Sequence, residues 1–459
     1  MQILKVSNFY KNNVIPFLLL LSLFLSFGFG SLIINLTILI LLIYFFINLR
    51  TVKIDFLDSI LIIFATYLFV SSFINFNYLF NNIFFLKFIF LTLSMKLIFH
   101  KINNNQLENL IKICSLFLIF LIFDIFYQKF FGVDVFGFKT GMGGARLSGP
   151  FKDKFIPGTL ILYLGFYFFL NFYIKFLSQN NFFKQLISLF ILFIFTSSIL
   201  LTGERMSFIS CLLSIILIIF FVNKKKLHIF FTLITFALCL LIILNDKNIY
   251  PRYEKFALQL KPKLTTQYFH ADEIEAYKEK NNINKKTSDE KKLKISFFDT
   301  TWGAHYLTAF QLFKKKPIFG NGIKSYRDLC GDVNIKSLRK DFRCSTHPHN
   351  IHLELLSEIG LIGYSIFLIL TLLIFFESSK IIINKKKYSE DTIFLFFSAS
   401  LIMCITLFFP IKSSGRLSST FFGSIYWINF AILYGSIFFL KKKYEINLKK
   451  NKIEKKTYK

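Results

Sequence analysis

Long apolar runs recur along nearly the whole chain, each separated from the next by a short polar segment. A run of roughly 18 or more nearly uncharged residues is long enough to cross a hydrocarbon core of about 30 Å as a helix. The pattern therefore predicts an all-α polytopic membrane protein. We predict twelve transmembrane helices, at residues 14–29, 32–49, 55–74, 79–99, 108–130, 156–176, 183–203, 205–222, 227–244, 354–376, 391–410 and 419–440.

The polar segments between these runs differ in their content of Lys and Arg. Alternate segments carry basic clusters such as "NKKK" (223–226) and "NKKKY" (384–388), and the tail at 441–459 is rich in Lys. Because cytoplasmic loops of membrane proteins carry an excess of Lys and Arg, the asymmetry predicts that both termini are cytoplasmic. The predicted location is therefore a membrane that the chain crosses many times.

One long hydrophilic segment, 245–353, falls on the extracytoplasmic side in this orientation. It separates predicted helices nine and ten and is long enough to form a small domain. The predicted organisation is nine helices in 1–244, a loop domain in 245–353, three helices in 354–440 and a basic tail in 441–459.

The loop domain contains two recognisable parts. Residues 270–294 are strongly charged, which predicts a solvated helix or a mobile loop. Residues 302–326 begin as an amphipathic helix, which we expect Pro317 to end before a turn at Gly320 and Gly322.

Composition agrees with a membrane protein. The chain has 459 residues, of which 54% are hydrophobic, and its mean hydropathy is +0.55. The formal net charge of +29 raises nucleic-acid binding as an alternative. The basic residues lie in juxtamembrane clusters, however, so we expect membrane lipids and no nucleic acid as partners.

The cysteines fall into two groups. Four lie in apolar runs, where small side chains pack well: Cys114, Cys211, Cys239 and Cys404. Cys330 and Cys344 lie in the loop domain, where an oxidising compartment would allow a disulfide worth about 3 kcal/mol. The alternative is two free thiols.

Three of the seven histidines stand close together in "STHPHNIHLELLSEIGLIG" (345–363), as His347, His349 and His352. A zinc site needs three or four ligands. A second ligand cluster is missing, and His347 and His349 would point apart on a helix, so we do not predict a metal. A polar cap on a membrane helix is the remaining alternative to a catalytic role.

A catalytic role is favoured by the position of His349. Thr346 as N-cap and Pro348 at the first helical position predict that His349 lies in the first turn of helix ten. The positive end of a helix disfavours an imidazolium and attracts phosphate. We therefore predict that His349 is a neutral general base beside a lipid-linked anion, supported by Asn350.

Four residues that follow the histidines are expected to support this helix. Glu354 and Glu358 are four residues apart and share a helix face, while Gly360 and Gly363 allow close helix packing.

Arginine is scarce in this Lys-rich chain, and three arginines fall in the short extracytoplasmic segments that we predict. Arg146 lies in "GGARLSGPFKDKF" (143–155), Arg205 follows Glu204 in "LTGERMSF" (201–208), and Arg416 lies in "PIKSSGRLSS" (410–419). A guanidinium binds phosphate through two parallel hydrogen bonds, so these are candidate phosphate ligands. The alternative is that each Arg only reaches the lipid headgroups.

Two further charged residues, Lys87 and Asp124, fall within predicted helices. Charges at such positions are candidates for function by default, but we assign these two no role.

Together these residues resemble the O-antigen ligase superfamily. The signature is His349-Asn350, nine residues, Gly360, two residues and Gly363. Three other stretches are similar to the pattern of that family: "RLSGPF" (146–151), "LTGERMSF" (201–208) and "PIFGNGIKSY" (317–326). Twelve helices with a large loop between helices nine and ten also agree.

The resemblance implies an inverting glycosyltransferase that needs no metal and no cofactor. Such an enzyme lies in the bacterial inner membrane and, on its periplasmic side, transfers a glycan from undecaprenyl diphosphate to an acceptor hydroxyl, which for a ligase belongs to lipid A-core. His349 would deprotonate the acceptor, and Arg146 and Arg205 would hold the diphosphate. The candidate supporting residues are Asn350, His347, His352, Glu354, Glu204 and Arg416. The sequence departs from the family at "FFDTTW" (297–302), which lacks the Arg often found before this Trp, so Arg416, Lys412 and Lys324 are candidates to replace it.

Ligation of O-antigen to lipid A-core is the function that we expect. An O-antigen or exopolysaccharide polymerase and a protein O-oligosaccharyltransferase of the same superfamily remain open. A flippase or transporter of lipid-linked sugar is an alternative of another class. It predicts charged residues at the bilayer midplane and gives no reason for an outer His with two outer Arg.

Overall fold

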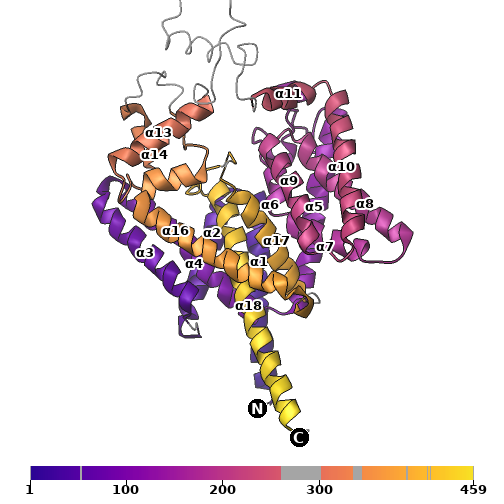
Figure 1. Cartoon of the computed structure of the whole chain (residues 1–459), viewed down its shortest axis with the longest axis vertical. Helices are drawn as coiled ribbons and strands as arrows, with labels where there is room; N and C mark the ends of the chain where they lie inside the picture. Colours follow the sequence, from indigo (N-terminus) through magenta and orange to yellow (C-terminus); the bar gives the residue numbers. More distant parts are fainter. Residues whose placement is uncertain are drawn as a thin grey trace, which may run out of the picture.

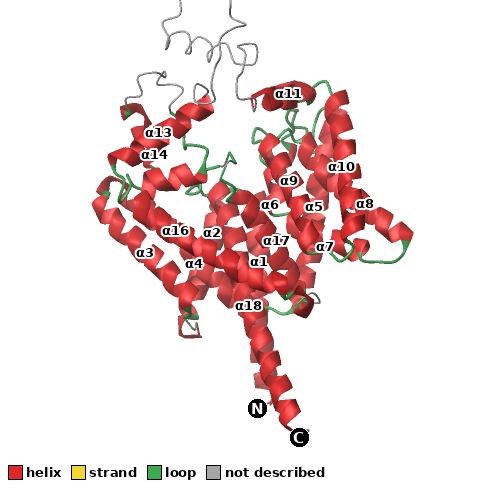
Figure 2. Cartoon of the chain, viewed as in Figure 1, coloured by secondary structure: helices red, strands yellow, loops and turns green. Residues whose placement is uncertain are grey.

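The structure is a computed structural model that describes residues 2–51, 54–259, 301–333, 344–388, 391–410, 412–413 and 415–457. These parts of the chain are almost entirely helices and loops, with two isolated bridges and no strand (Figure 2). The helices in Figure 1 are α1 (Gln2–Leu25), α2 (Ser31–Ile47), α3 (Phe56–Ile74), α4 (Leu79–Lys101), α5 (Asn104–Phe131), α6 (Pro157–Tyr163), α7 (Phe166–Leu177), α8 (Phe182–Leu201), α9 (Arg205–Leu217), α10 (Lys225–Asn245), α11 (Tyr250–Gln259), α13 (Thr301–Lys315), α14 (Ser325–Leu329), α16 (Ile351–Ile383), α17 (Thr392–Leu407) and α18 (Phe421–Thr457).

Every predicted transmembrane range contains a helix, but not every helix is a full span. In the described residues, α3, α4, α5, α8, α10, α16 and α18 are long and apolar enough to cross a membrane. α6 and α7 form an eighth span if the pair, bent by 53°, is counted as one. Four other apolar helical stretches are shorter: Val14–Gly28, which includes the end of α1, Ser31–Ile47 (α2), Arg205–Phe220, which begins with α9, and Thr392–Leu407 (α17). The structure therefore supports a multi-pass all-α protein without confirming twelve crossings.

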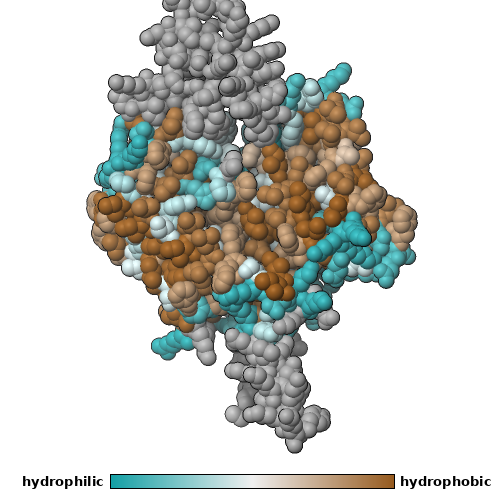
Figure 3. Space-filling model, in the orientation of Figure 1, coloured by the Kyte–Doolittle hydropathy of each residue, from teal (hydrophilic) through white to brown (hydrophobic). Residues whose placement is uncertain are grey.

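The helices pack around α4 and α18, which lie against each other along the centre of the bundle. α3 and α16 pack together on one side, and α8 packs against α7 and α10 on the other (Figure 1). Trp427 of α18 stacks on Phe88 of α4 with ring centroids 5.8 Å apart, and both side chains are buried. The outer surface between the two ends is mostly hydrophobic on the face shown in Figure 3, as a lipid-facing belt requires.

The two charged residues within predicted helices have structural partners. Lys87 Nζ donates a hydrogen bond to Asn35 Oδ1 (2.8 Å) and lies 3.8 Å from the centre of the Phe84 ring. Asp124 Oδ1 accepts a hydrogen bond from the Val135 N–H (2.8 Å). Both side chains therefore hold neighbouring segments together, and neither lies at the candidate site.

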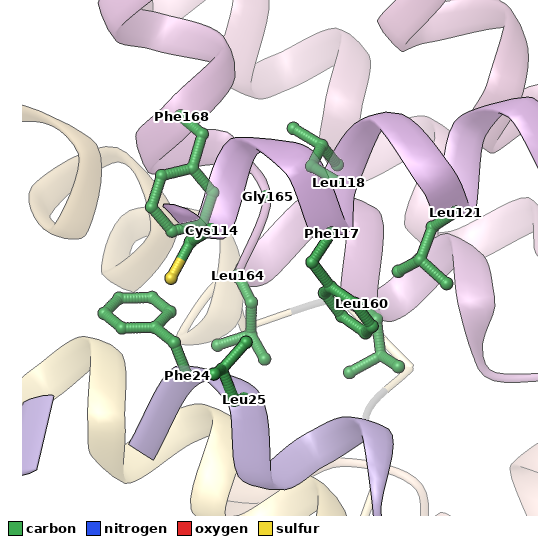
Figure 4. A pocket seen from close by; sticks show the side chains of 10 residues that line it. All are labelled: Phe24, Leu25, Cys114, Phe117, Leu118, Leu121, Leu160, Leu164, Gly165 and Phe168. Carbon is green, nitrogen blue, oxygen red and sulfur yellow. The ribbon is translucent and has the colours of Figure 1, made fainter. Parts of the chain in front are cut away.

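A small apolar pocket lies beside the bend between α6 and α7, with an empty volume of about 330 Å³ (Figure 4). Gly165 stands at the bend, where a Cβ atom would lie 2.4 Å from the carbonyl oxygen of Ile161. The residues that line this pocket belong to α1, α5 and the bend between α6 and α7: Phe24, Leu25, Cys114, Phe117, Leu118, Leu121, Leu160, Leu164, Gly165 and Phe168.

One end of the molecule carries α11, α13 and α14, opposite to both chain termini (Figure 1). α13 ends two residues before Pro317, and the predicted turn has positive φ at Gly320 (71°) and Gly322 (99°). A disulfide joins Cys330 to Cys344, whose Cα atoms are 5.2 Å apart. The predicted charged helix or loop at 270–294 lies outside the described residues.

Candidate functional site

An open cavity with an empty volume of about 1020 Å³ lies at this end of the bundle. One group of lining residues, here called the imidazole wall, consists of Trp302, His347 and His349, and the ring of His305 contacts that of His349. A second group, here called the arginine wall, consists of Arg146, Arg205 and Arg252. The cavity thus joins residues of the loop after α5, the start of α9, α11, α13 and the turn before α16.

His349 is held in the imidazole wall by aromatic contacts. Its ring centroid lies 4.6 Å from that of Trp302, 4.1 Å from that of His347 and 5.3 Å from that of His305. Trp302 and His305 belong to α13, so this helix supports the ring from behind. His347 Nδ1 also lies within hydrogen-bond distance of Thr346 Oγ1 (2.8 Å).

His305 was not predicted as a site residue. Its side chain is buried and its Nδ1 has no hydrogen-bond partner among the described residues. Burial, with a smaller contribution from the neighbouring His349, lowers the pKa of His305 to about 4. His305 is therefore neutral near pH 7 and presents a ring, not a charge, to His349.

The predicted start of helix ten is wrong. α16 begins at Ile351, and its N-cap is Asn350, whose Oδ1 accepts hydrogen bonds from the N–H groups of His352 (3.0 Å) and Leu353 (3.1 Å). Thr346 and Pro348 lie before the helix. His349 has a φ of 58°, which a right-handed helix does not allow, so it lies in the turn that precedes the first helical residue.

Asn350 also ties the helix to the loop between α17 and α18. Its Nδ2 donates to the carbonyl oxygen of Pro410 (2.7 Å). His352 connects the same two segments, because Nδ1 lies 3.0 Å from Tyr364 Oη and Nε2 lies 3.0 Å from the Phe408 carbonyl oxygen. Both ring nitrogens of His352 are thus used away from the cavity, and the structure does not place it beside the reacting groups.

Glu354, Glu358 and Arg416 hold the same loop to α16. The Glu354 carboxylate accepts the N–H of Leu417 at 3.1 Å. Arg416 Nη2 donates to the carbonyl oxygen of Lys324 (3.1 Å) and lies 3.9 Å from Glu358 Oε1. These residues do not line the cavity, so Arg416 is not brought to the arginine wall.

The two glycines of the signature have different surroundings. Gly360 interrupts α16 with a φ of 66°, and the segment 317–322 docks there: the Leu361 N–H donates to Pro317 O (2.7 Å) and the Gly322 N–H to Glu358 O (2.8 Å). A Cβ at Gly360 would lie 2.3 Å from Ile318 O. Gly363 instead packs against the Tyr67 ring of α3.

The arginine wall depends on a close backbone contact between two loops. Arg146 pairs with Gly141 through both backbone hydrogen bonds, and the Leu147 N–H donates to Thr202 O (3.3 Å). Gly203 has a φ of 69°, and a Cβ there would lie 2.3 Å from Ala145 O. The sharp turn before α9 therefore brings Arg205 next to the loop that carries Arg146.

The third arginine comes from α11. Arg252 Nη2 donates to Gly203 O (3.3 Å), and Arg205 Nη1 donates to Arg252 O (3.4 Å). Burial and the nearby positive charges of Arg146 and Arg205 lower the pKa of Arg252. Arg146 lies with its guanidinium carbon 4.7 Å from the centre of the Phe155 ring.

Arg252 was not predicted, although it is an Arg in the predicted extracytoplasmic segment, the criterion that selected Arg146. Its place beside Arg146 and Arg205 gives the cavity a third guanidinium. The segment before Trp302 that lacks the family's Arg lies, except for Thr301, outside the described residues. Arg252 is therefore a candidate for the cationic role that the sequence left open.

Glu204 forms part of the floor between the two walls. Its carboxylate accepts hydrogen bonds from the Gly158 N–H (2.7 Å) and the Thr159 Oγ1 hydroxyl (2.6 Å) at the start of α6, and from Ser207 Oγ (3.1 Å). Burial raises the pKa of Glu204, while these hydrogen bonds and Arg146 oppose that shift. Glu204 thus ties the turn before α9 to α6.

Lys412 reaches the cavity from the loop between α17 and α18. It is buried, donates a hydrogen bond to Tyr163 Oη and lies 4.6 Å from the centre of the Tyr163 ring. Burial lowers the pKa of Lys412 to about 7. Of the three residues proposed from the sequence to replace the absent Arg, Lys412 is the one that lines the cavity.

The described parts of the chain contain no group of three or more His, Cys, Asp or Glu side chains that could hold a metal ion. The ring of His349 contacts those of His347, His305 and Trp302. The indole of Trp302 is not a metal ligand.

Comparison with known families supports the resemblance. Residues 190–368 match the family model described as O-antigen ligase, which supports the resemblance of the chain to the O-antigen ligase superfamily. This family and the multi-pass helical structure support a membrane glycosyltransferase of the ligase or polymerase type. The match includes Arg205, Arg252 and His349. No curated protein matches the chain.

Proposed function

We propose that the protein transfers a glycan from undecaprenyl diphosphate to an acceptor hydroxyl, and that the product is O-antigen joined to lipid A-core. The observation that carries this proposal is the cavity itself. The same cavity is lined by His349 and by Arg146, Arg205 and Arg252, residues from distant parts of the sequence, at one end of a membrane helix bundle. A base and a group of fixed cations are the two requirements of this reaction.

His349 acts as the general base. It takes the proton of the acceptor hydroxyl while the acceptor oxygen bonds to the anomeric carbon of the glycan. The bond from that carbon to the diphosphate oxygen breaks on the opposite side, so the anomeric configuration inverts. The contacts with Trp302, His305 and His347 fix the orientation of the ring that accepts the proton.

The arginine wall holds the diphosphate, which is the leaving group. Negative charge grows on the leaving oxygen as its bond to carbon breaks, and guanidinium groups placed in advance stabilise this charge without reorganisation. Arg146 and Arg205 are the primary ligands, and Arg252 supplements them. The reaction needs no metal in this scheme because the arginines supply the positive charge.

Deletion of the gene followed by lipopolysaccharide gel electrophoresis tests the proposal. Loss of all long-chain bands from the core, with carrier-linked polymer accumulating, is the expected result. A single-repeat band would indicate a polymerase instead. Unchanged lipopolysaccharide with a loss of glycosylated proteins would indicate a protein O-oligosaccharyltransferase. Carrier-linked glycan retained on the cytoplasmic side would indicate a flippase.

A further inference from the structure

Two lysine-rich loops that are far apart in the sequence lie together at the end of the bundle opposite to the catalytic cavity. α9 begins at the cavity with Arg205 and continues through a 3₁₀ turn, η6 (Ile218–Phe220), to the lysine-rich segment 223–226, where α10 begins. α16 likewise runs from the imidazole wall to the loop at 384–388. Hydrophilic surface gathers at this end, where α7 is followed by α8 (Figure 3).

The two loops border a pocket with an empty volume of about 1230 Å³. The pocket has an apolar part, formed by α7, the end of the α9 segment and α17, to which Leu177, Phe221, Phe394 and Leu395 contribute. Its rim is basic and includes Lys224, Lys385 and Lys386, here called the lysine rim. A pocket that is apolar inside and has lysines at its rim suits an amphiphile with an anionic headgroup.

The positive charge of the lysine rim is not cancelled by acids. Lys224 Nζ donates to Asn180 Oδ1 (2.9 Å), and Lys385 Nζ donates to Phe220 O (2.9 Å), both neutral acceptors. The acid in the pocket lining, Asp391, pairs with Lys443 at 2.5 Å. Among the described residues, Lys386 has no hydrogen-bond or ion-pair partner.

The charges at the rim also repel each other. Partial burial, together with the nearby positive charge of Lys225, lowers the pKa of Lys385. The two loops are thus held close enough for their like charges to interact, which disfavours the empty pocket. A bound anion relieves that repulsion.

We propose that this pocket binds one anionic glycerophospholipid, with its phosphate against the lysine rim and an acyl chain in the apolar part. Basic pockets between transmembrane helices bind anionic lipid headgroups in this way. The small pocket in Figure 4 is lined by apolar side chains and one cysteine, and offers no cation to a headgroup. Charge and apolar depth occur together at the lysine rim, which selects a lipid over a free phosphate.

The test uses the full-length protein in nanodiscs made from equal amounts of phosphatidylglycerol and phosphatidylethanolamine. Native mass spectrometry after release from the nanodisc measures which lipid each protein retains. We expect wild type to retain phosphatidylglycerol in preference to phosphatidylethanolamine. The double variant Lys224→Gln/Lys386→Gln should lose this preference by about tenfold or more, because each basic residue near an anionic surface contributes roughly fivefold.

Two further variants separate the explanations. Lys112→Gln/Lys184→Gln removes the same charge from exposed positions at this end that do not line the pocket, and should retain lipid like wild type. Leu395→Trp keeps every charge but fills the apolar part, and should also lose phosphatidylglycerol. Lys386→Gln alone, at an exposed position, serves if the double variant does not fold.

The proposal is overturned if wild type retains both lipids equally, or if the lysine-rim and control double variants retain phosphatidylglycerol to the same extent. Full retention by Leu395→Trp would also overturn it, because it would mean that the rim binds phosphate alone. None of these results depends on glycan transfer, because the pocket and the catalytic cavity have no lining residue in common.

Discussion

The two walls of the catalytic cavity are built by different means. The imidazole wall carries rings, and it is fixed by helix structure: Asn350 caps α16, and α13 places Trp302 and His305 against His349. The arginine wall carries fixed charges, and it is fixed by backbone contacts between loops, above all that of Gly203 with Ala145. The two walls are thus held in place by different parts of the chain.

This separation matters because the two tasks make opposite electrostatic demands. Neighbouring cations lower the pKa of a histidine and so weaken it as a base, whereas a diphosphate site needs as many cations as possible. The rings of Trp302, His305 and His347 contact His349, and three guanidinium groups line the same cavity. The comparison predicts that changes in one wall affect turnover and changes in the other affect donor binding.

The largest effect is expected for His349→Ala. Removing a general base typically costs about 10²–10⁴ in rate, so transfer should fall to near background. The measurement is the rate at which the purified full-length protein transfers glycan to acceptor. The neighbouring substitution His347→Ala is the control: it removes one contact of the His349 ring but not the base, so it should lose much less activity; equal losses in the two variants would contradict the assignment of the base to His349.

The next effect is expected for Arg205→Lys. Lysine keeps the charge but lacks the planar guanidinium that binds phosphate through two parallel hydrogen bonds. Affinity for the donor should therefore fall about tenfold or more. Titration of the transfer rate against donor concentration measures it. Arg416→Lys, outside the cavity, is the matched control. Wild-type behaviour of Arg205→Lys would mean that this side chain only anchors the turn.

Gly360→Ala should weaken the imidazole wall by displacing the segment that docks on α16. The added Cβ would lie 2.3 Å from Ile318 O and 2.5 Å from Gly320 N at a positive φ. Gly132→Ala is matched in φ (76°) but meets nothing within 4 Å. The control should cost about 1–2 kcal/mol for its strained backbone, and Gly360→Ala clearly more. Thermal unfolding of the detergent-purified protein compares them, and equal melting temperatures would contradict the docking.

The smallest effect concerns pH. The pKa of Lys412 is about 7, so in the empty cavity this lysine is charged below that pH and loses its charge above it. Donor binding should therefore weaken as pH rises from 7 to about 9, by less than about tenfold in all. Lys412→Gln should remove this dependence. Lys154→Gln, an exposed lysine outside the cavity, should retain it; a slope unchanged in Lys412→Gln would assign the titration elsewhere.

The sequence predicted the helical membrane architecture and brought His349, Arg146 and Arg205 to the same side, because apolar runs and the distribution of basic residues carry that information. It did not predict which polar residue begins α16. Thr346 and Asn350 are both good N-caps, and the hydrogen bond from Asn350 to Pro410 arises only in the folded bundle. His352 was misleading for the same reason, since its partners are Tyr364 and Phe408.

Arg252 and His305 were missed for a different reason. They lie on α11 and α13, short helices whose direction is fixed by packing on the bundle and not by any local pattern. His305 is 44 positions before His349 in the sequence, yet their ring centroids lie 5.3 Å apart. Sequence reasoning can select such residues by type, but only their packing shows which wall they join.

The measurement that tests the division between the two walls most directly compares donor binding with transfer in His349→Ala and Arg205→Lys. Binding of radiolabelled undecaprenyl-diphosphate-linked glycan to the full-length protein in nanodiscs gives the affinity, and single-turnover transfer gives the rate. We predict that His349→Ala binds donor nearly as well as wild type while losing transfer, and that Arg205→Lys loses affinity for the donor. Loss of donor binding in His349→Ala as great as that in Arg205→Lys would contradict the account.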